Sequence, residues 1–262
     1  MKKIVFIMLV MLGLCFPLWA DYKEAINKGD YAAAREELKP LAQRGDAEAQ
    51  YNLGRMYNKG QGVPQNDEMA VRWFTKAAEQ GLAEAQFGLG WMYQEGRGVP
   101  QNYAEAIKWY VKAAELGYDK AQYNLGLMYN NGQGVQPNYA EAVKWYTKAA
   151  EQGIANAQYN LGLMNYYGQG VQQNYAEAAK WYIKAAEQGF ANAQFNLGMM
   201  YAKGQGMPQN YVKAYMWWCL AAARGISAAK ANRDDLAKLM TPAQVSEAHK
   251  LISAWKPKKT GE

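Results

Sequence analysis

The chain has 262 residues, of which 29 are lysine or arginine and 23 are aspartate or glutamate, giving a formal net charge of +6. This mild excess, carried partly by Lys256 and Lys258 near the C-terminus, is not clustered as a nucleic-acid-binding face requires, so no nucleic-acid partner is expected. Two cysteines and one histidine are too few for the usual zinc ligand sets, and no metal or cofactor is expected.

The first twenty residues have the pattern of an export signal. Two lysines precede an apolar run at residues 4–16, which is too short to cross a bilayer as a helix of roughly 20 residues. Ala20 offers a small residue before Asp21, so cleavage is expected there and the product is expected to be periplasmic or secreted, without an integral membrane segment; an uncleaved anchor is the alternative. Only Cys219 would remain, so no internal disulfide is expected.

Residues 21–45 are expected to form an N-terminal capping pair of helices. Gly45 stands 36 residues before Gly81, so the segment shares the spacing that recurs through residues 46–225. Pro40 and Glu37 break the pattern, as terminal members of a repeat array commonly do.

A period of 36 residues runs through residues 46–225 as five repeats, without insertion or deletion. Such a period indicates one supersecondary element per repeat, stacked on its neighbours to bury a continuous core. A glycine marks the first half of each repeat: Gly54, Gly90, Gly126, Gly162 and Gly198. A tryptophan marks the second half: Trp73, Trp109, Trp145, Trp181 and Trp217.

Each repeat is interpreted as helix, loop, helix. In the third repeat Ala121, Leu125 and Met128 recur at the spacing of one helix face. Gly126 lies inside that helix at a cost of about 1 kcal/mol relative to alanine, which predicts close packing that any Cβ would obstruct. The loop at residues 132–135 has two glycines suited to positive φ; without a preceding strand it does not predict a phosphate site.

The second helix of the repeat opens at an asparagine. Asn102, Asn138 and Asn174 are expected as N-caps, and the glutamate three residues after each is expected to reach back to the cap N–H, as in a capping box. The Trp-Tyr pairs recur at one place per repeat and are interpreted as core between helices rather than as ligand-stacking residues. Glutamates near the helix end are interpreted as structural or solvated: Glu79, Glu115, Glu151 and Glu187.

Residues 226–255 are expected to form C-terminal capping helices, the last with Thr241 as N-cap and Pro242 at the first helical position. Residues 256–262 form a basic tail. The whole pattern predicts an all-α fold, an α/α superhelical solenoid of helix-loop-helix repeats in one continuous domain.

These motifs resemble the Sel1-like repeat family, a branch of the tetratricopeptide-repeat superfamily. The resemblance rests on Ala-x-Tyr-Asn-Leu-Gly-x-Met-Tyr, Gly-x-Gly-Val and Ala-x-Lys-Trp-Tyr-x-Lys-Ala-Ala-Glu-Gln-Gly together, over residues 46–225. Two residues depart from these motifs: Asn165 stands where the other repeats have tyrosine, and Lys213 stands where three other repeats have glutamate. Both changes concern local packing or capping, not the fold. The resemblance implies a superhelix with a concave face and a non-catalytic scaffold or adaptor role, which in bacteria often serves the cell envelope; it does not name the protein or peptide partner.

The resemblance also implies a binding surface, because in tetratricopeptide geometry the first helices line the concave face. Residues three before, one after and four after the mid-helix glycine share one helix face. The middle series varies while the packing positions repeat, and its apolar row would suit an amphipathic helix or an extended peptide; partial burial in the superhelix is the alternative. The predicted partner-binding residues are Tyr51, Arg55, Phe87, Trp91, Tyr123, Leu127, Tyr159, Leu163, Tyr166, Phe195 and Met199.

The sequence does not predict an enzyme, and no catalytic residue is assigned. His249 has Ser246 and Ser253 within four residues on one helix, a common accident of spacing rather than a nucleophile–base pair. Cysteine-rich relatives of the family have been linked to penicillin binding and weak β-lactam hydrolysis, so a β-lactam-directed activity is the alternative function. Those relatives carry a cysteine pair in each repeat, which this sequence lacks.

Overall fold

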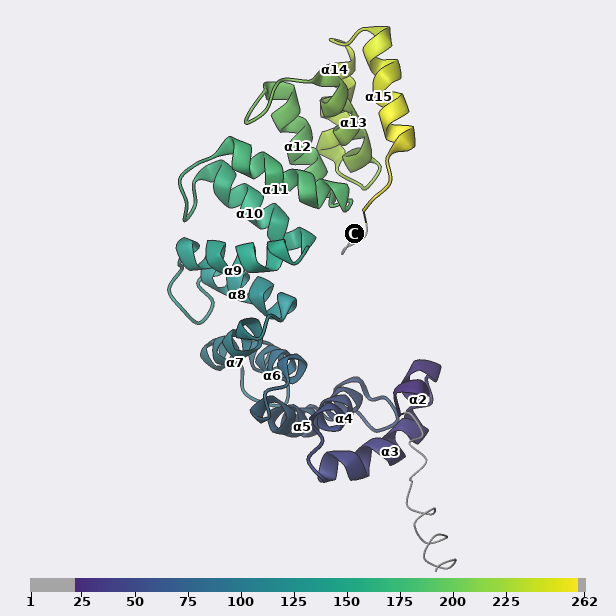
Figure 1. Ribbon diagram of the computed structural model, residues 1–262, viewed down its shortest axis with the longest axis vertical. Coiled ribbons are helices and arrows are strands. Elements are labelled where there is room, and N and C mark those ends of the chain that lie inside the picture. The colour runs from purple at the N-terminus through teal and green to yellow at the C-terminus, as the bar shows by residue number, and fades with distance from the viewer. Residues whose placement is uncertain (1–21, 259–262) are drawn as a thin grey trace, which may run out of the picture. The chain divides into compact units, whose positions relative to one another are not determined.

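The computed structural model describes residues 22–258, which form fourteen helices and no strand (Figure 1). The expected export signal at residues 1–20 and the end of the basic tail lie outside this range. Two helices precede the repeats: α2 (Tyr22–Lys28) and α3 (Tyr31–Gln43). The first helices of the repeats are α4 (Ala47–Lys59), α6 (Ala83–Glu95), α8 (Asp119–Asn131), α10 (Ala155–Tyr167) and α12 (Ala191–Lys203). The second helices are α5 (Asp67–Glu79), α7 (Tyr103–Glu115), α9 (Tyr139–Glu151), α11 (Tyr175–Glu187) and α13 (Tyr211–Ala222). The last two helices are α14 (Ser227–Ala237) and α15 (Pro242–Ala254).

The chain forms two compact units that divide inside α7, between Ala113 and Ala114. The first unit holds α2 to α6 and most of α7, and the second holds α8 to α15. Within each unit the two helices of a repeat pack against each other, and each pair packs against the next (Figure 1). The predicted all-α, helix-loop-helix architecture is therefore confirmed.

The mid-helix glycines allow the two helices of a repeat to approach closely. A Cβ at Gly90 would lie 2.8 Å from the ring of Tyr110 and 3.2 Å from the carbonyl oxygen of Ala106. A Cβ at Gly162 would lie 2.6 Å from the ring of Tyr182. The predicted close packing is confirmed, because each of these glycines faces an aromatic ring of its own repeat: Phe74, Tyr110, Tyr146, Tyr182 and Trp218.

The recurring tryptophans join one repeat to the repeat before it. Trp181 on α11 is buried in a cluster with Tyr146 of the preceding repeat and Leu161 of its own repeat. Trp73 on α5 packs against the N-terminal pair, beside Leu38. The tyrosine that follows the tryptophan packs inside its own repeat. Each Trp-Tyr pair therefore contributes one aromatic residue to the interface between repeats and one to the interface within a repeat, which agrees with its interpretation as core.

A buried glutamine also links each first helix to the helix before it. Gln158 Nε2 donates to the carbonyl oxygen of Ala150 at 3.0 Å, and Gln158 Oε1 accepts from Gln188 Nε2 at 2.8 Å. Carbonyls at the end of a helix have no partner inside the helix, so this amide satisfies a helix end and joins two repeats. The same donation is made in every repeat, by Gln50, Gln86, Gln122, Gln158 and Gln194.

The asparagine N-caps are confirmed, but the expected reach of the glutamates is wrong. Asn138 Oδ1 accepts the N–H of Glu141 at 3.1 Å. The Glu141 carboxylate does not turn back; it lies 3.4 Å from Lys144 Nζ. The physical reason is that the Asn138 N–H already donates to the Tyr129 carbonyl at 2.8 Å, so the cap has no donor left to offer. Equivalent caps are made by Asn102 and Asn174, and Glu105 and Glu177 likewise pair with Lys108 and Lys180.

The C-terminal helices agree closely with the sequence prediction. Thr241 caps α15 in a full capping box with Gln244, and Pro242 occupies the first turn. The predicted positive φ of the loop glycines is also confirmed. Gly170, for example, has φ 72°, and a Cβ there would lie 2.4 Å from the backbone carbonyl of Tyr139.

Candidate functional site

His249 and Cys219 have the side-chain types most often used in catalysis, and both pack against Tyr215. The Tyr215 hydroxyl lies 3.4 Å from Nε2 of His249, and Tyr215 also interacts with the Cys219 thiol. Burial raises the pKa of Cys219, which suppresses its thiolate. Across residues 22–258 there is no cluster of histidine, cysteine and carboxylate side chains able to hold a metal ion, nor a helix long and apolar enough to cross a membrane.

The predicted partner-binding residues of the first unit lie on α4 and α6 and are half-buried. They are Tyr51, Arg55, Phe87 and Trp91. The Arg55 guanidinium lies 5.6 Å from the ring centroid of Tyr51. The Arg97 guanidinium lies 5.1 Å from the ring of Trp91 and binds Asp67 with two hydrogen bonds of 2.9 and 3.0 Å. Because this cation already covers Trp91, the tryptophan is a poor free anchor for a partner.

The predicted residues of the second unit lie on α8, α10 and α12 and are also half-buried. They are Tyr123, Leu127, Tyr159, Leu163, Tyr166, Phe195 and Met199. Their aromatic rings contact those of the second helices: the Tyr123 and Tyr146 centroids are 6.0 Å apart, and the Tyr159 and Tyr182 centroids are 5.9 Å apart. Each residue is therefore partly packed into the repeat, as the alternative of partial burial describes, and a role in partner binding stays a prediction.

Asparagines on the next first helix hold these ring pairs in place. The Asn196 side chain hydrogen-bonds to the hydroxyls of Tyr159 and Tyr182. Burial raises the pKa of both tyrosines, and the hydrogen bond from Asn196 acts in the opposite direction. Asn160 makes the same bonds to the preceding pair. The surface of the first helices in the second unit is thus an aromatic face with fixed, neutral hydroxyls.

A pocket of about 190 Å³ opens on this face. Its walls are Tyr166, Tyr167, Tyr182, Phe195, Asn196 and Met199, none of which is charged. The Tyr166 ring lies 5.0 Å from the rings of both Tyr167 and Tyr175, and its hydroxyl donates to Gln205 Oε1 at 3.1 Å. Tyr167 itself is 63% exposed. Since small-molecule pockets measure roughly 300–1,000 Å³, this one suits a single bulky side chain of a larger partner.

Tyr166, Phe195 and Met199, three of the predicted partner-binding residues, line this pocket, whereas its other three walls were not among the predicted residues. Tyr182 and Asn196 follow the repeat pattern and look like ordinary core and surface positions. Tyr167 had a signal: the fourth repeat has Tyr166-Tyr167 where the third has Asn130-Asn131 and the fifth has Ala202-Lys203. Two adjacent aromatic residues at a normally polar or small position could have indicated the site.

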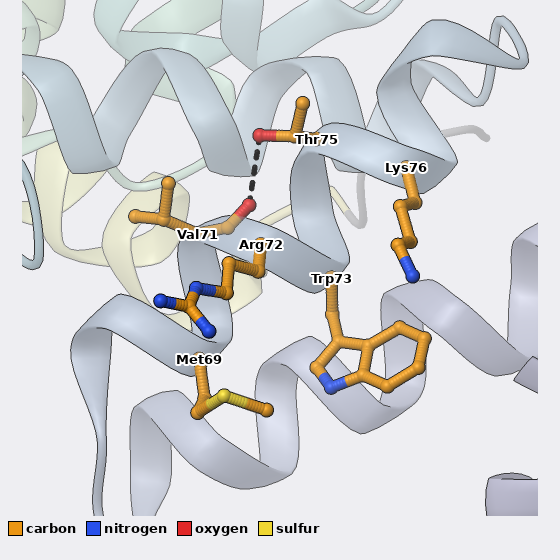
Figure 2. Close-up of a pocket in the computed structure, with 6 residues that line it drawn as sticks. All are labelled: Met69, Val71, Arg72, Trp73, Thr75 and Lys76. Carbon is orange, nitrogen blue, oxygen red and sulfur yellow. Dashed lines mark hydrogen bonds between the residues drawn. The ribbon is translucent and has the colours of Figure 1, made fainter. Parts of the chain in front are cut away.

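A larger hollow of about 460 Å³ lies on α5 (Figure 2). Its lining is Met69, Val71, Arg72, Trp73, Thr75 and Lys76. Lys76 Nζ lies 4.7 Å from the Trp73 ring, and the Thr75 hydroxyl donates to the Val71 carbonyl at 2.8 Å. Because all six residues come from one helix, this is an open surface hollow rather than an enclosed site.

Stacked helix pairs at a constant spacing of 36 residues, linked by recurring glutamines and tryptophans, define an α/α helical-repeat protein. The Sel1 repeat model matches five consecutive segments that cover most of the chain, and the protein belongs to the Sel1 repeat family. The matched segments are residues 47–82, 83–118, 119–154, 155–190 and 191–226.

Solved structures and a curated relative agree with this assignment. A Sel1 repeat protein from Oxalobacter formigenes is 36% identical, with a TM-score of 0.72 over 91% of this chain and 97% of that one. A protective antigen of uropathogenic Escherichia coli that displays an SLR fold is 30% identical over 86% of this chain and 64% of that one, with a TM-score of only 0.38. A Sel1-like repeat-containing protein of Acanthamoeba polyphaga mimivirus is 46% identical over 43 residues, 16% of this chain, which spans only 7% of the length of that relative.

Proposed function

We propose that this protein is a non-catalytic scaffold that binds a segment of a partner protein on the first helices of its second unit. Sel1 repeat proteins are typically protein-interaction scaffolds. The observation that carries the proposal is the pocket beside Tyr166, where an exposed aromatic residue, Tyr167, stands over an uncharged, half-buried floor. Binding energy at protein interfaces concentrates in a few aromatic or apolar anchors, and this pocket has room for one of them.

The test starts from a peptide selected on the intact protein from a displayed library. Tyr167→Ala, which removes an exposed side chain, and Phe195→Ala, which opens the pocket floor, are expected together to weaken the peptide at least tenfold, about 1.4 kcal/mol. Binding is measured by calorimetry. Lys144→Ala, an exposed change on α9, is the control and should leave affinity unchanged.

The outcome is informative only while the fold is intact, so circular dichroism accompanies each variant. Tyr167→Ala alone has little packing to lose, and it should keep the wild-type helical signal. If peptides bind the Tyr167→Ala and Phe195→Ala variants as tightly as the wild type, the pocket is not the site and the proposal is wrong.

We also propose that the protein acts in the bacterial cell envelope or outside the cell. The support is the sequence at residues 1–20, which has a positive start, an apolar run and Ala20 before Asp21. Expression in a bacterial host should yield a chain that begins at Asp21. Mass spectrometry that finds Met1 intact in the major species would contradict this proposal.

A further inference from the structure

The C-terminal segment does not end with α15 but folds back onto the second helices of the last repeats. Trp255 ends α15 with extended backbone. The Lys258 N–H donates to the Glu187 carbonyl at 2.8 Å, and Lys258 Nζ lies 2.8 Å from Glu187 Oε2. The Trp255 ring meets Trp217 at 79° with centroids 6.4 Å apart, and the Arg224 guanidinium lies 4.9 Å from Trp255. A backbone hydrogen bond, an ion pair and two contacts of the Trp255 ring therefore hold residues 255–258 against the repeats, as they would hold a bound peptide.

Three features of the repeats receive this segment: the tryptophan of a second helix, and the carbonyl and carboxylate of the glutamate that ends the second helix of the preceding repeat. The carbonyl is available because the last carbonyls of a helix have no partner within the helix. Glu187 is half-buried beneath the segment, whereas Glu151 and Glu115 at the same repeat position are exposed. The segment therefore uses the recurring elements of the fold.

The same features recur along the chain at 36-residue spacing. In the second unit Trp181 follows the helix that ends at Glu151, and Trp145 follows Glu115; in the first unit Trp109 follows Glu79. At Trp73 the corresponding helix ends at Gln43, a neutral residue. The two cations beside the hollow of Figure 2, Arg72 and Lys76, have lysine counterparts in the next three repeats and do not set this position apart. The missing carboxylate is therefore what disfavours a cationic segment at Trp73.

Two differences separate the occupied position from the others. Arg224, whose guanidinium lies over the Trp255 ring, has glutamine at the corresponding position of the two preceding repeats, Gln188 and Gln152. Where Leu220 stands in the last repeat, the other repeats have a lysine over the tryptophan: Lys184 Nζ lies 4.2 Å from the Trp181 ring and Lys148 Nζ lies 4.5 Å from the Trp145 ring. Cation–π contacts at exposed sites are weak and lysine stems are flexible. An arriving aromatic side chain can therefore displace the lysine.

We propose that the second helices form a docking surface for extended segments of partner proteins that carry an aromatic residue followed three positions later by lysine. The chain's own residues 255–258 occupy the last such position. The glutamates of the open positions, Glu79, Glu115 and Glu151, supply the carboxylate. This surface is distinct from the pocket on the first helices, so either proposal can fail without the other.

The first experiment asks whether lysine beside the tryptophan blocks docking. Leu220→Lys gives the occupied position the lysine that the open positions have beside the tryptophan. Amide hydrogen exchange of Lys258, whose N–H donates to the Glu187 carbonyl, is expected to remain slow in this variant and to become at least tenfold faster in Trp255→Ala. If Leu220→Lys frees the segment as fully as Trp255→Ala does, the open positions cannot accept such a segment and the proposal is overturned.

The second experiment supplies the segment from outside. A labelled peptide of residues 253–258 is titrated into the full chain and followed by fluorescence anisotropy. Saturable binding is expected. Replacing all three glutamates of the open positions with glutamine should weaken it by about two- to fivefold, the range for an exposed ion pair. The matched control replaces Glu105, Glu141 and Glu177, partly exposed glutamates at helix starts, with glutamine. A peptide with alanine for Trp255 should not bind.

Three results would overturn the proposal. One is failure of the peptide to bind the full chain. Another is equal loss in the control that replaces Glu105, Glu141 and Glu177, which would indicate nonspecific attraction to negative charge. The third is concentration-dependent self-association that Trp255→Ala abolishes, since the occupant would then be a second copy. Tyr167→Ala should leave peptide binding unchanged, and this result keeps the test separate from that of the pocket.

Discussion

Two glycines in α6, Gly88 and Gly90, differ in the space that a neighbouring ring leaves for a Cβ. A Cβ at Gly90 would lie 2.8 Å from the Tyr110 ring, whereas a Cβ at Gly88 would lie 3.7 Å from the Phe74 ring, an ordinary contact. Both glycines carry the same helix penalty, about 1 kcal/mol relative to alanine. Packing alone separates them, so they form a matched pair for mutation.

Gly90→Ala is expected to lower the free energy of unfolding by about 1–3 kcal/mol, because the added methyl overpacks the interface with Tyr110. Gly88→Ala is expected to raise it by up to about 1 kcal/mol, because the helix penalty is removed without a clash. Chemical denaturation measures both. Equal stabilisation by the two changes would show that close helix packing is not the reason for Gly90.

At the scale of the helix, two interactions at the start of α9 differ in how much they stabilise it. Asn138 Oδ1 accepts a backbone N–H that has no other partner in the helix. Glu141, by contrast, makes only an ion pair with Lys144, and both side chains are more than a third exposed. Exposed pairs of this kind contribute little, because water screens the charges.

Asn138→Ala is therefore expected to cost about 1 kcal/mol of stability, and Glu141→Ala less than about 0.5 kcal/mol. Thermal unfolding of the two variants, followed by circular dichroism, gives the comparison. A cost for Glu141→Ala as large as that for Asn138→Ala would mean that the glutamate does cap the helix in solution.

At the scale of the whole molecule, buried tyrosines give the repeat core a dependence on pH. Burial raises the pKa of Tyr146 and Tyr182 well above the ordinary value, although asparagine hydrogen bonds act against the shift. In the unfolded chain the same phenols titrate near their ordinary pKa of about 10. Above that pH the unfolded chain releases protons that the folded chain retains, so stability falls as pH rises.

The free energy of unfolding is expected to be insensitive to these groups below about pH 10 and to decline above it. Tyr146→Phe and Tyr182→Phe should make the decline shallower, at some loss of stability near neutral pH because hydrogen bonds are removed. Tyr139→Phe, at a side chain that is 42% exposed, serves as control. Denaturant titrations across this pH range would contradict the prediction if the Tyr182→Phe slope equalled that of the wild type.

Residues with a local role were predicted correctly from the sequence. Asn138 as a cap, Gly126 as a point of close approach and Thr241 as the start of the last helix are all indicated by spacing within one or two turns. The role of Gln158, which binds both Ala150 and Gln188, was not predicted, because its partners lie on other helices. Glu141 was assigned the wrong partner, because the donor it was expected to bind is taken by a carbonyl from the preceding helix.

By itself the sequence determined the fold and the family, because a constant period of helix signals constrains each repeat through contacts close in the chain. The tertiary structure decided what depends on distant residues: which faces of the first helices remain half-open, that Arg97 covers Trp91, and that Tyr167 borders a pocket with Phe195. It also decided where the C-terminal segment lies, since Lys258 and Glu187 are 71 residues apart. A repeating pattern gives every repeat the same local preferences, and only three-dimensional packing shows where the repeats come to differ.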